Sequence, residues 1–419
     1  MVLFFATEAR FIKNKQGIVY AVDKSFSYDL WKRYLGSFSE IHVIARVNFE
    51  SNFEDNKNTI SSGNNVFFKE IPYYIGWFGF IKKYYSFKSS VKKIVYESEG
   101  VFICRVPGVV GTSVIKRLIK LNKKFGLEVV GDPWEVIETG KFKIPFKTLI
   151  KYKLYFDLKN QIKNASAVLY VTKETLQKRY PPSENQFTTN ISDVKINNRD
   201  SNKDKNNSLI NDQFVTYVSN VKLINRDIDF IKKIPTNSNF KIISVGSLAQ
   251  LYKGPDVLIK AVSILKQRGI NCKLTWLGDG KFLDEIKKLS INCGVYNNVE
   301  FIGNVPSETV FQYLENSDLF VLASRTEGLP RAIVEAMSVG MPCVATRVGG
   351  IPELLEESVL VEKDDEISLA NKIQYLFENP DFFNYQAKRN YEESKNYLED
   401  VLNLKRRAFF EFLIKQHSL

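Results

Sequence analysis

Two carboxylates, Glu327 and Glu335, lie in a stretch whose pattern suits the binding of a phosphorylated ligand. Apolar Leu319–Ala323 predicts a buried strand, the polar loop Ser324–Gly328 follows it, and a helical pattern begins by Pro330. Where the carboxyl end of a strand meets the start of a helix, free N–H groups and the helix dipole favour an anion. A diphosphate fits such a corner, and Glu327 can accept hydrogen bonds from sugar hydroxyls. The alternative is that both carboxylates are ordinary charges at a helix start.

A lysine occupies the corresponding loop of an earlier strand–loop–helix unit. Apolar Phe240–Ser247 predicts a strand, and Pro255–Arg268 has helical spacing, with a proline suited to its first position. Lys253 lies between them, where its ammonium could neutralise a diphosphate, an electrostatic role that often dominates catalysis. A solvated loop lysine is the alternative.

Both units resemble the donor-binding segments of glycosyltransferase family 4, a retaining group (glycosyl transferases group 1) with the GT-B fold. Ser324–Pro352 reads SRTEGLPRAIVEAMSVGMPCVATRVGGIP, in which Glu327 and Glu335 have the E-x7-E spacing of the family. Val245–Val262 reads VGSLAQLYKGPDVLIKAV and has a lysine, Lys253, at the family's diphosphate-binding position. The resemblance is specific for this part of the chain and general over the first half.

The resemblance implies a retaining transfer from a nucleoside diphosphate sugar. It makes Glu327 and Lys253 the catalytic residues, and it places Glu335 on the ribose hydroxyls. The other donor contacts that it implies are Gly246, Ser247, Gly278, Gly303, Asn304, Val305, Gly328, Leu329, Pro330 and Arg331. The nucleotide sugar is then a co-substrate and no cofactor is required. The base stays open, because backbone contacts need no particular side chain.

One position departs from the family pattern. Six residues before Lys253, where the family usually has an arginine, this chain has Ser247. Arg325 or Arg331 could replace the lost phosphate contact from the same corner. No Asp-x-Asp motif occurs, so a metal is not expected. In a front-face reaction the departing phosphate can itself take the acceptor's proton, and the enzyme supplies positioning and charge stabilisation.

The first half is expected to bind the acceptor. Glu8 and Arg10 follow the predicted strand Val2–Thr7, Asp132 follows a later strand, and Arg105 lies at the end of another. These four are the acceptor-side candidates. For Asp132 a second interpretation stays open, because Asp-Pro is a common turn pair.

Histidines and cysteines exclude other chemistries. His42 falls inside a predicted strand and His417 lies near the terminus, so a catalytic histidine is not expected. The four cysteines are scattered without a CxxC pair, which favours reduced thiols and argues against a metal site.

The elements that must position these residues alternate along the chain. The second half predicts strands and helices in turn, and the first half repeats the theme less cleanly, with strands that include Ile41–Val47, Val66–Ile71, Val101–Val106, Leu127–Val130 and Ala167–Val171. Such alternation predicts an α/β protein with parallel sheets. With the resemblance, the expected fold is GT-B: two Rossmann-like doubly wound domains facing across a cleft, with a C-terminal helix crossing back to the N-terminal domain.

A chain of 419 residues favours two domains. The predicted boundaries are 1–215 for the acceptor-binding domain, 216–395 for the donor-binding domain and 396–419 for the returning helix. The run Asn197–Gln213 has little to bury and is expected to be a surface loop.

The net charge of +12 is uneven. Residues 1–196 hold 31 Lys and Arg against 18 Asp and Glu, a net +13, whereas the rest holds 28 against 29, a net −1. Pro72–Lys93 and Lys141–Lys163 combine aromatic and basic residues, a pattern typical of contact with an anionic membrane surface. Ordinary surface helices with aromatics in the core are the alternative. No signal peptide or membrane span is recognisable, so a cytoplasmic protein, peripheral on the inner face, is expected.

Other functions are less well supported. A dinucleotide fingerprint after Gly278-x-Gly280 would need a third glycine where Leu283 stands, which argues against an NAD-dependent oxidoreductase. A sugar-nucleotide epimerase would need acid and base residues in both halves. A catalytically degenerate sugar-nucleotide-binding protein is favoured only by Ser247 and the missing histidine. No nucleic-acid-binding motif occurs. The expected role is transfer to a glycan or lipid-linked acceptor in polysaccharide or cell-envelope synthesis.

Overall fold

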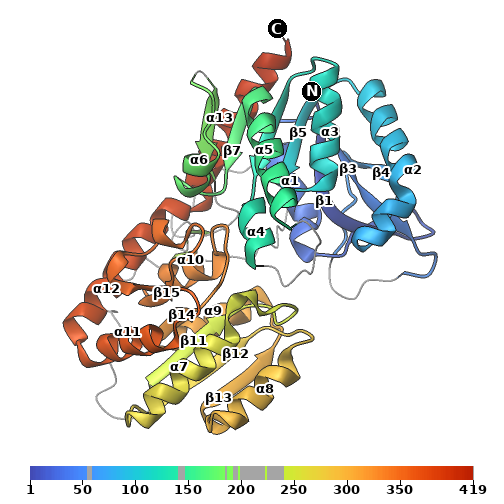
Figure 1. Ribbon diagram of the computed structural model, residues 1–419. Helices are drawn as coiled ribbons and strands as arrows, with labels where there is room; N and C mark the ends of the chain where they lie inside the picture. The colour runs from blue at the N-terminus through green and yellow to red at the C-terminus, as the bar shows by residue number, and fades with distance from the viewer. Residues whose placement is uncertain are drawn as a thin grey trace, which may run out of the picture. The chain divides into compact units, whose positions relative to one another are not determined.

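The computed structural model divides the chain into two compact units (Figure 1). The first contains Met1–Trp134, Lys143–Ile191 and Asn403–Leu419, and the second contains Glu135–Phe142 and Ser192–Leu402. The residues that the structure describes are 1–53, 59–139, 147–184, 186–191, 197–198, 222–223 and 240–418. Most of the predicted polar loop at 197–213 therefore lies outside the described residues.

The first unit is a twisted sheet with strand order β4-β3-β1-β5-β6-β7-β8. These pairs are all parallel, and β2 adds to β1 antiparallel. The strands are β1 (Val2–Lys13), β2 (Val19–Ala21), β3 (Glu40–Phe49), β4 (Val66–Ile71), β5 (Val101–Val106), β6 (Phe125–Val129), β7 (Ala167–Tyr170) and β8 (Phe187–Asn190). Apolar runs such as VFICRV in β5 are almost wholly buried, as expected of parallel strands covered on both faces.

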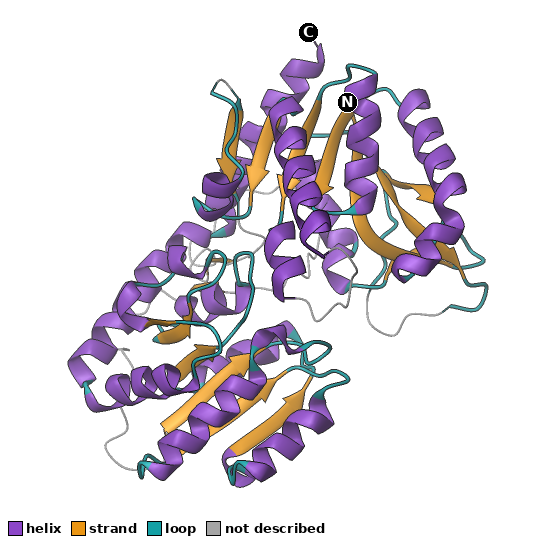
Figure 2. Ribbon diagram, in the orientation of Figure 1, coloured by secondary structure: helices purple, strands orange, loops and turns teal. Residues whose placement is uncertain are grey.

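The helices of this unit pack on that sheet (Figure 2). They are α1 (Tyr28–Leu35), α2 (Gly76–Glu97), α3 (Val109–Lys120), α5 (Lys147–Asn164), α6 (Thr175–Arg179) and α13 (Glu399–Ser418), and α4 (Pro133–Thr139) begins in it. Helix α13 is the returning C-terminal helix. Its Phe410 ring lies 5.2 Å from that of Tyr34, and Gly126 of β6 lets Leu413 approach, because a Cβ there would be 2.5 Å from a Leu413 methyl.

The second unit is a six-stranded parallel sheet with the order β13-β12-β11-β14-β15-β16. Its strands are β11 (Phe240–Val245), β12 (Cys272–Leu277), β13 (Val299–Gly303), β14 (Leu319–Leu322), β15 (Cys343–Thr346) and β16 (Leu360–Val361). Its helices are α7 (Pro255–Gln267), α8 (Leu283–Asn292), α9 (Ser307–Glu315), α10 (Arg331–Ser338), α11 (Glu366–Glu378) and α12 (Pro380–Ser394). The long helical stretch expected after Pro380 is therefore α12 and α13, separated by a short turn. Between the units a further short parallel pair joins β9 (Asn197–Asn198) and β10 (Lys222–Leu223).

Each sheet has a point where strand order reverses, between β1 and β5 in the first unit and between β11 and β14 in the second. In doubly wound sheets, ligands bind beyond the carboxyl ends of the strands at this switch point. The predicted architecture of two Rossmann-like domains is confirmed, including the helix that returns to the first domain. Within the described residues, no helix has the length and apolarity needed to span a bilayer.

Candidate active site

The switch point of the second unit brings Lys253 and Glu327 together. Lys253 ends a short 3-10 helix in the loop after β11, and Glu327 lies in the loop after β14. The Lys253 Nζ is 2.6 Å from Glu327 Oε1, and the two side chains are only 14% and 8% exposed. Because two buried charges need each other and further hydrogen bonds, their positions are tightly constrained.

Further hydrogen bonds hold the Glu327 carboxylate. Ser324 Oγ donates to the same Oε1 at 2.6 Å, and Thr346 Oγ1, at the end of β15, donates to the Ser324 carbonyl at 2.5 Å. One carboxylate oxygen thus receives an ammonium and a hydroxyl. The sequence placed Ser324 and Thr346 at strand ends but gave neither a role.

Two glycines let the loops of this corner touch. Gly254 has φ +64°, and a Cβ there would be 1.9 Å from the Ala323 carbonyl oxygen. Gly349 has φ +54°, and a Cβ there would be 1.9 Å from the Glu327 carbonyl oxygen. Other residues are therefore excluded at both positions by backbone conformation and by space. The glycine after Gly349, Gly350, donates its N–H to the Gly328 carbonyl at 2.6 Å.

Two helices start at this corner. The N-cap positions of α7 and α10 are Gly254 and Pro330, and neither makes a side-chain cap. The first-turn N–H groups of α10 and the Lys253 ammonium both favour a negatively charged ligand. Leu329, also a predicted donor contact, packs half-buried against the core of this unit.

Glu335 and Arg331 lie one turn apart on α10. Burial raises the pKa of Glu335, and the charge of Arg331 opposes that rise. Arg331 is exposed at the first position of the helix and is free to meet a ligand. Arg325 is not, because its guanidinium binds Asp256 and Asp364. The structure thus leaves Arg331, and not Arg325, to compensate for Ser247.

The glycine turns after β11, β12 and β13 are joined by backbone hydrogen bonds. Gly246 donates to the Leu277 carbonyl at 2.9 Å, and Gly278 donates to the Gly303 carbonyl at 2.8 Å. Ser247 fixes the first turn, because its hydroxyl accepts from the Ala249 N–H at 3.1 Å and lies 3.3 Å from the Asp279 carbonyl. After β13, Asn304 is exposed and Val305 half-buried.

In the first unit, Glu8 occupies the switch point. Its Oε2 accepts a hydrogen bond from the Val110 N–H, in the first turn of α3, at 2.9 Å, and its Oε1 lies 2.9 Å from Arg46 Nη2. The Arg46 guanidinium lies over the Tyr74 ring, 4.5 Å from its centroid. The sequence missed Arg46 and Tyr74, although a charged residue inside the apolar run of β3 was a usable signal.

The expectation that Glu8 and Arg10 follow the first strand is wrong. The strand β1 continues to Lys13, with a register irregularity between Ala6 and Arg10, because its second half pairs with β2. Glu8 lies within this irregularity, and Arg10 lies opposite Arg46 of β3.

The other two acceptor-side candidates have partners within the first unit. Asp132 accepts from the Trp134 N–H at 2.9 Å and from the Tyr180 hydroxyl at 2.6 Å, and it pairs with Arg179. This geometry supports the turn interpretation of Asp132. Arg105 lies near Glu128, with Nη1 3.9 Å from Oε2. The four acceptor-side candidates and the donor candidates belong to different units.

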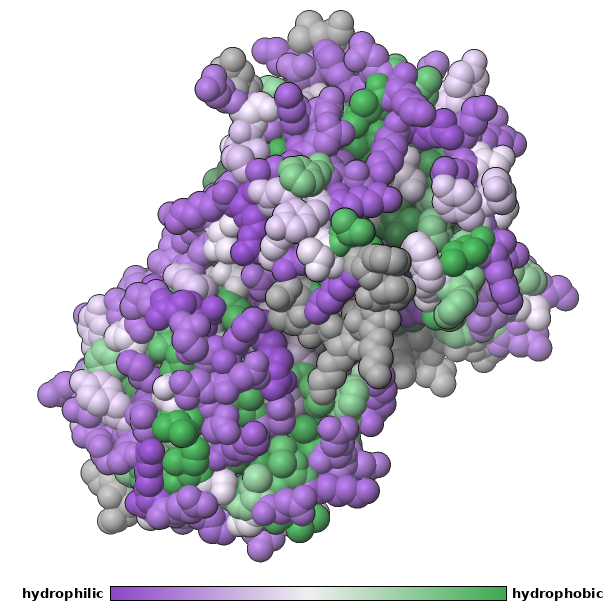
Figure 3. Space-filling model, viewed as in Figure 1, coloured by the Kyte–Doolittle hydropathy of each residue, from purple (hydrophilic) through white to green (hydrophobic). Residues whose placement is uncertain are grey.

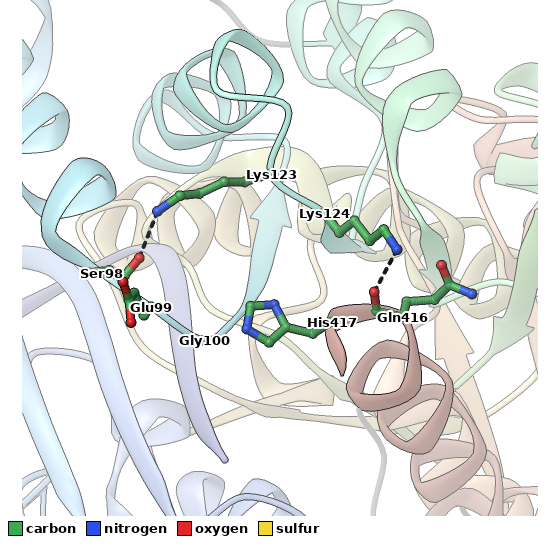
Figure 4. Close-up of a pocket in the computed structure, with 7 residues that line it drawn as sticks. All are labelled: Ser98, Glu99, Gly100, Lys123, Lys124, Gln416 and His417. Carbon is green, nitrogen blue, oxygen red and sulfur yellow. Dashed lines mark hydrogen bonds between the residues drawn. The ribbon is translucent and has the colours of Figure 1, made fainter. Parts of the chain in front are cut away.

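A cavity of about 380 Å³ lies in the first unit at the amino ends of β5 and β6. It is lined by Ser98, Glu99, Gly100, Lys123, Lys124, Gln416 and His417 (Figure 4). Lys123 donates to the Val95 and Ser98 carbonyls at the end of α2, and Lys124 donates to the Gln416 carbonyl at the end of α13. Both lysines thus cap helix carboxyl ends at the sheet edge opposite the switch point. Across the described parts of the chain, no cluster of His, Cys, Asp or Glu could hold a metal.

Comparison with known proteins gives consistent relationships. Residues 225–395 match a family model described as glycosyl transferases group 1. Protein CapJ of Staphylococcus aureus is 31% identical over 354 residues, which are 83% of this chain and 80% of CapJ. The amylovoran biosynthesis glycosyltransferase AmsK of Erwinia amylovora is 38% identical over 125 residues, 28% of this chain and 30% of AmsK. Anabaena Alr3699/HepE, solved in complex with UDP, covers 100% of both chains with a TM-score of 0.61 at 16% identity, so it shares the fold.

Proposed function

The chain belongs to the group 1 glycosyltransferases, and we propose that it transfers a sugar, with retention of configuration, from a nucleoside diphosphate sugar held at the switch point of its second unit. The observation that carries the proposal is the pair of Lys253 and Glu327, 2.6 Å apart beside the start of α10. A cation, a carboxylate and a helix start together provide for a diphosphate and for sugar hydroxyls.

Lys253 would stabilise the leaving group. The bond between the sugar C1 and the diphosphate oxygen breaks, a bond from C1 to the acceptor oxygen forms, and the acceptor's proton passes to the departing phosphate. Negative charge grows on that phosphate during the reaction, so a fixed ammonium stabilises the transition state more than the bound substrate. Without donor, Glu327 neutralises this ammonium, and the diphosphate would take over part of that role.

The remaining donor contacts follow from their positions on the same edge. Glu335 would hold ribose hydroxyls, and Arg331 would supply the phosphate contact that Ser247 cannot. The backbone of the turns at Gly246, Gly278 and Gly303, with Asn304 and Val305, would hold the base and the diphosphate. HepE is described in complex with UDP, so uridine nucleotides are the first to test.

The first unit would hold the acceptor. Glu8 is its best-placed carboxylate, because it lies at the switch point and its side chain is 36% exposed. Arg10 and Arg105 are secondary candidates, and Asp132 is committed to its turn. The name of AmsK refers to amylovoran biosynthesis, which supports a glycan or lipid-linked acceptor and a role in polysaccharide or cell-envelope synthesis.

Donor hydrolysis tests this function. The full chain is incubated with UDP-, GDP- and ADP-sugars, and release of the nucleoside diphosphate is compared with that of Glu327→Ala. We expect release from one donor by the wild type and a fall of about 10²–10³-fold in the variant, the usual cost of losing a preorganised electrostatic group. Equal background release in both would favour the alternative of a sugar-nucleotide-binding protein.

We also propose that α2 attaches the enzyme to an anionic lipid surface. Phe78, Tyr85 and Tyr96 are 82%, 85% and 74% exposed. They share one side of the helix, opposite the buried Phe87 and Val91. Exposed lysines accompany them at Lys82, Lys83, Lys88, Lys92 and Lys93. Surface aromatics flanked by lysines suit an interface with anionic headgroups, and a lipid-linked acceptor would be reached there.

Helix α5 adds to this surface, and Figure 3 shows how hydrophobic residues interrupt the hydrophilic surface of the molecule. Leu149 and Phe156 are 67% and 60% exposed, so the aromatic and apolar residues of this helix are not all in the core. The alternative that these segments bury their aromatics therefore does not describe α2 and only partly describes α5.

Vesicle flotation tests the attachment. We expect the full chain to bind phosphatidylcholine vesicles only when phosphatidylglycerol is added. The double variant Phe78→Ser, Tyr85→Ser should bind at least about 10-fold more weakly, because burying each aromatic contributes about 1–3 kcal/mol. Ile291→Ser with Tyr296→Ser, two exposed apolar residues of the second unit, is the matched control. Equal binding by both double variants would contradict the proposal.

A further inference from the structure

The Arg325 guanidinium ties together the two loops that carry Lys253 and Glu327. It comes from the loop after β14, two residues before Glu327, and its Nη1 donates to the Leu251 carbonyl at 2.6 Å. Its own backbone N–H donates to the Tyr252 carbonyl at 2.7 Å. The 3-10 turn that ends in Lys253 is thus held at two successive carbonyls by one residue.

Two carboxylates hold this guanidinium in turn. Asp256, in the first turn of α7, receives Nη1 at 2.9 Å and Nη2 at 2.7 Å, a two-point contact that fixes the plane of the guanidinium. Asp364, in the loop after β16, receives Nε at 2.6 Å. Burial alone would raise the pKa of Asp256, but the hydrogen bonds and charge of Arg325 outweigh it and the pKa is lowered. All three nitrogens of the side chain are therefore engaged, and three strand-end loops meet at one residue.

Asp364 makes this contact in an unusual backbone conformation. Its φ is +62°, a left-handed value that aspartate adopts more readily than most residues but that still costs energy. The bond to Arg325 gives the loop after β16 a reason to hold this shape. Neither Asp256 nor Asp364 was a candidate in the sequence.

We infer that Arg325, held by Asp256 and Asp364, is a positioning residue that sets the Lys253 ammonium against Glu327 for sugar transfer. The inference rests on the proposed function. It assigns Arg325 no contact with donor, because its donors already have protein partners. Loss of Arg325 would leave the lysine present but free to move from the place where charge develops.

The test compares Arg325→Gln with Arg347→Gln in the full chain. Arg347 is a matched control, because it also pairs with two carboxylates, Glu357 and Glu362, but on the exposed surface of the same unit. We expect Arg325→Gln to lower kcat by about 30-fold with donor KM changed less than about 3-fold, since a small misplacement can cost up to about 10²-fold. Arg347→Gln should keep both parameters. Unchanged kcat, or a raised donor KM at unchanged kcat, would overturn the inference.

Hydrogen exchange provides a readout that does not depend on activity. In Arg325→Gln the amides of residues 251–254 should exchange faster than in the wild type, and in Arg347→Gln they should not. Unchanged exchange in Arg325→Gln would overturn the positioning role. If Arg325→Gln does not fold, Asp364→Asn removes one partner only, and it should show the same two effects at smaller size. Absence of turnover by the wild type with any donor would contradict the proposed function, and hydrogen exchange would still decide the role of Arg325.

Discussion

The switch points of the two units hold their charges differently. In the first unit, Glu8 of β1 reaches across to the start of α3, where it accepts the Val110 N–H at 2.9 Å. In the second unit, the carboxylate of Glu327 binds Lys253 at 2.6 Å, and the start of α10 receives no side-chain cap from its N-cap residue, Pro330. The same corner of the same fold is filled by the protein's own carboxylate in one unit and not in the other.

This difference assigns ligands to the two corners. A carboxylate at a helix start satisfies an N–H group and offsets the positive end of the helix dipole, so the first corner has less to offer an anion. The second corner keeps a cation and an uncapped helix start, which together favour a diphosphate. The comparison therefore supports donor binding in the second unit and a hydroxyl-rich acceptor in the first.

The largest expected effect comes from Lys253→Ala. We expect kcat/KM for the donor to fall by about 10²–10³-fold, because a preorganised charge on the leaving group is lost. Steady-state kinetics with the preferred donor measure this. Lys260→Ala is the control, because Lys260 is a half-exposed lysine of α7 in the same unit, paired with Glu366 at 3.4 Å. Similar losses in both variants would break the comparison.

Next in size is the effect of Gly254→Ala on stability. We expect the free energy of unfolding to fall by about 2–4 kcal/mol, because the new methyl must displace the Ala323 carbonyl and the left-handed backbone becomes strained. Gly269→Ala is matched, since it also has a positive φ but nothing lies near its Cβ position. It should cost about 1 kcal/mol. Equal losses by urea denaturation would show that close approach is unimportant at Gly254.

Glu8→Gln sharpens the other side of the comparison. Its neutral side chain should stabilise the start of α3 less well and leave Arg46 without its counter-charge, so the free energy of unfolding should fall by about 1–2 kcal/mol. Donor KM should be unchanged and acceptor KM raised. A raised donor KM would contradict the assignment of the first unit to the acceptor.

The smallest expected effect is on pH-dependent stability at Glu335. Because burial raises the pKa of Glu335 in the folded state above its ordinary value, the folded protein keeps a proton that the unfolded chain has lost. Stability therefore falls as pH rises through that window. Glu335→Gln should raise the Tm of the donor-free protein at pH 8 by about 2–4 °C, the shift that about 1 kcal/mol gives in a domain of this size. At pH 4 the two should melt alike, and an equal Tm at both pH values would contradict the expectation.

Much of the fold could be predicted because buried parallel strands are short apolar runs between turn residues. The predicted strands Val66–Ile71, Val101–Val106 and Cys272–Leu277 have the observed bounds. The continuation of β1 to Lys13 was missed, because it depends on pairing with β2 and has no periodicity of its own.

The candidate site divides in the same way. Lys253 and Glu327 could be found because they lie in local strand–loop–helix patterns. The partners of Arg325 could not, because Asp256 and Asp364 are 69 and 39 residues away in the chain and only the fold brings them together. Arg325 was predicted as a phosphate contact on position alone, and its actual partners exclude that role.

Calorimetric titration of the full chain with UDP, GDP and ADP tests most directly where the donor binds. We predict that one nucleoside diphosphate binds the wild type and Glu8→Gln with equal affinity, and that Lys253→Ala weakens its binding by at least about tenfold, or about 1.4 kcal/mol. Equal affinity in wild type and Lys253→Ala, with loss of binding in Glu8→Gln, would contradict the account.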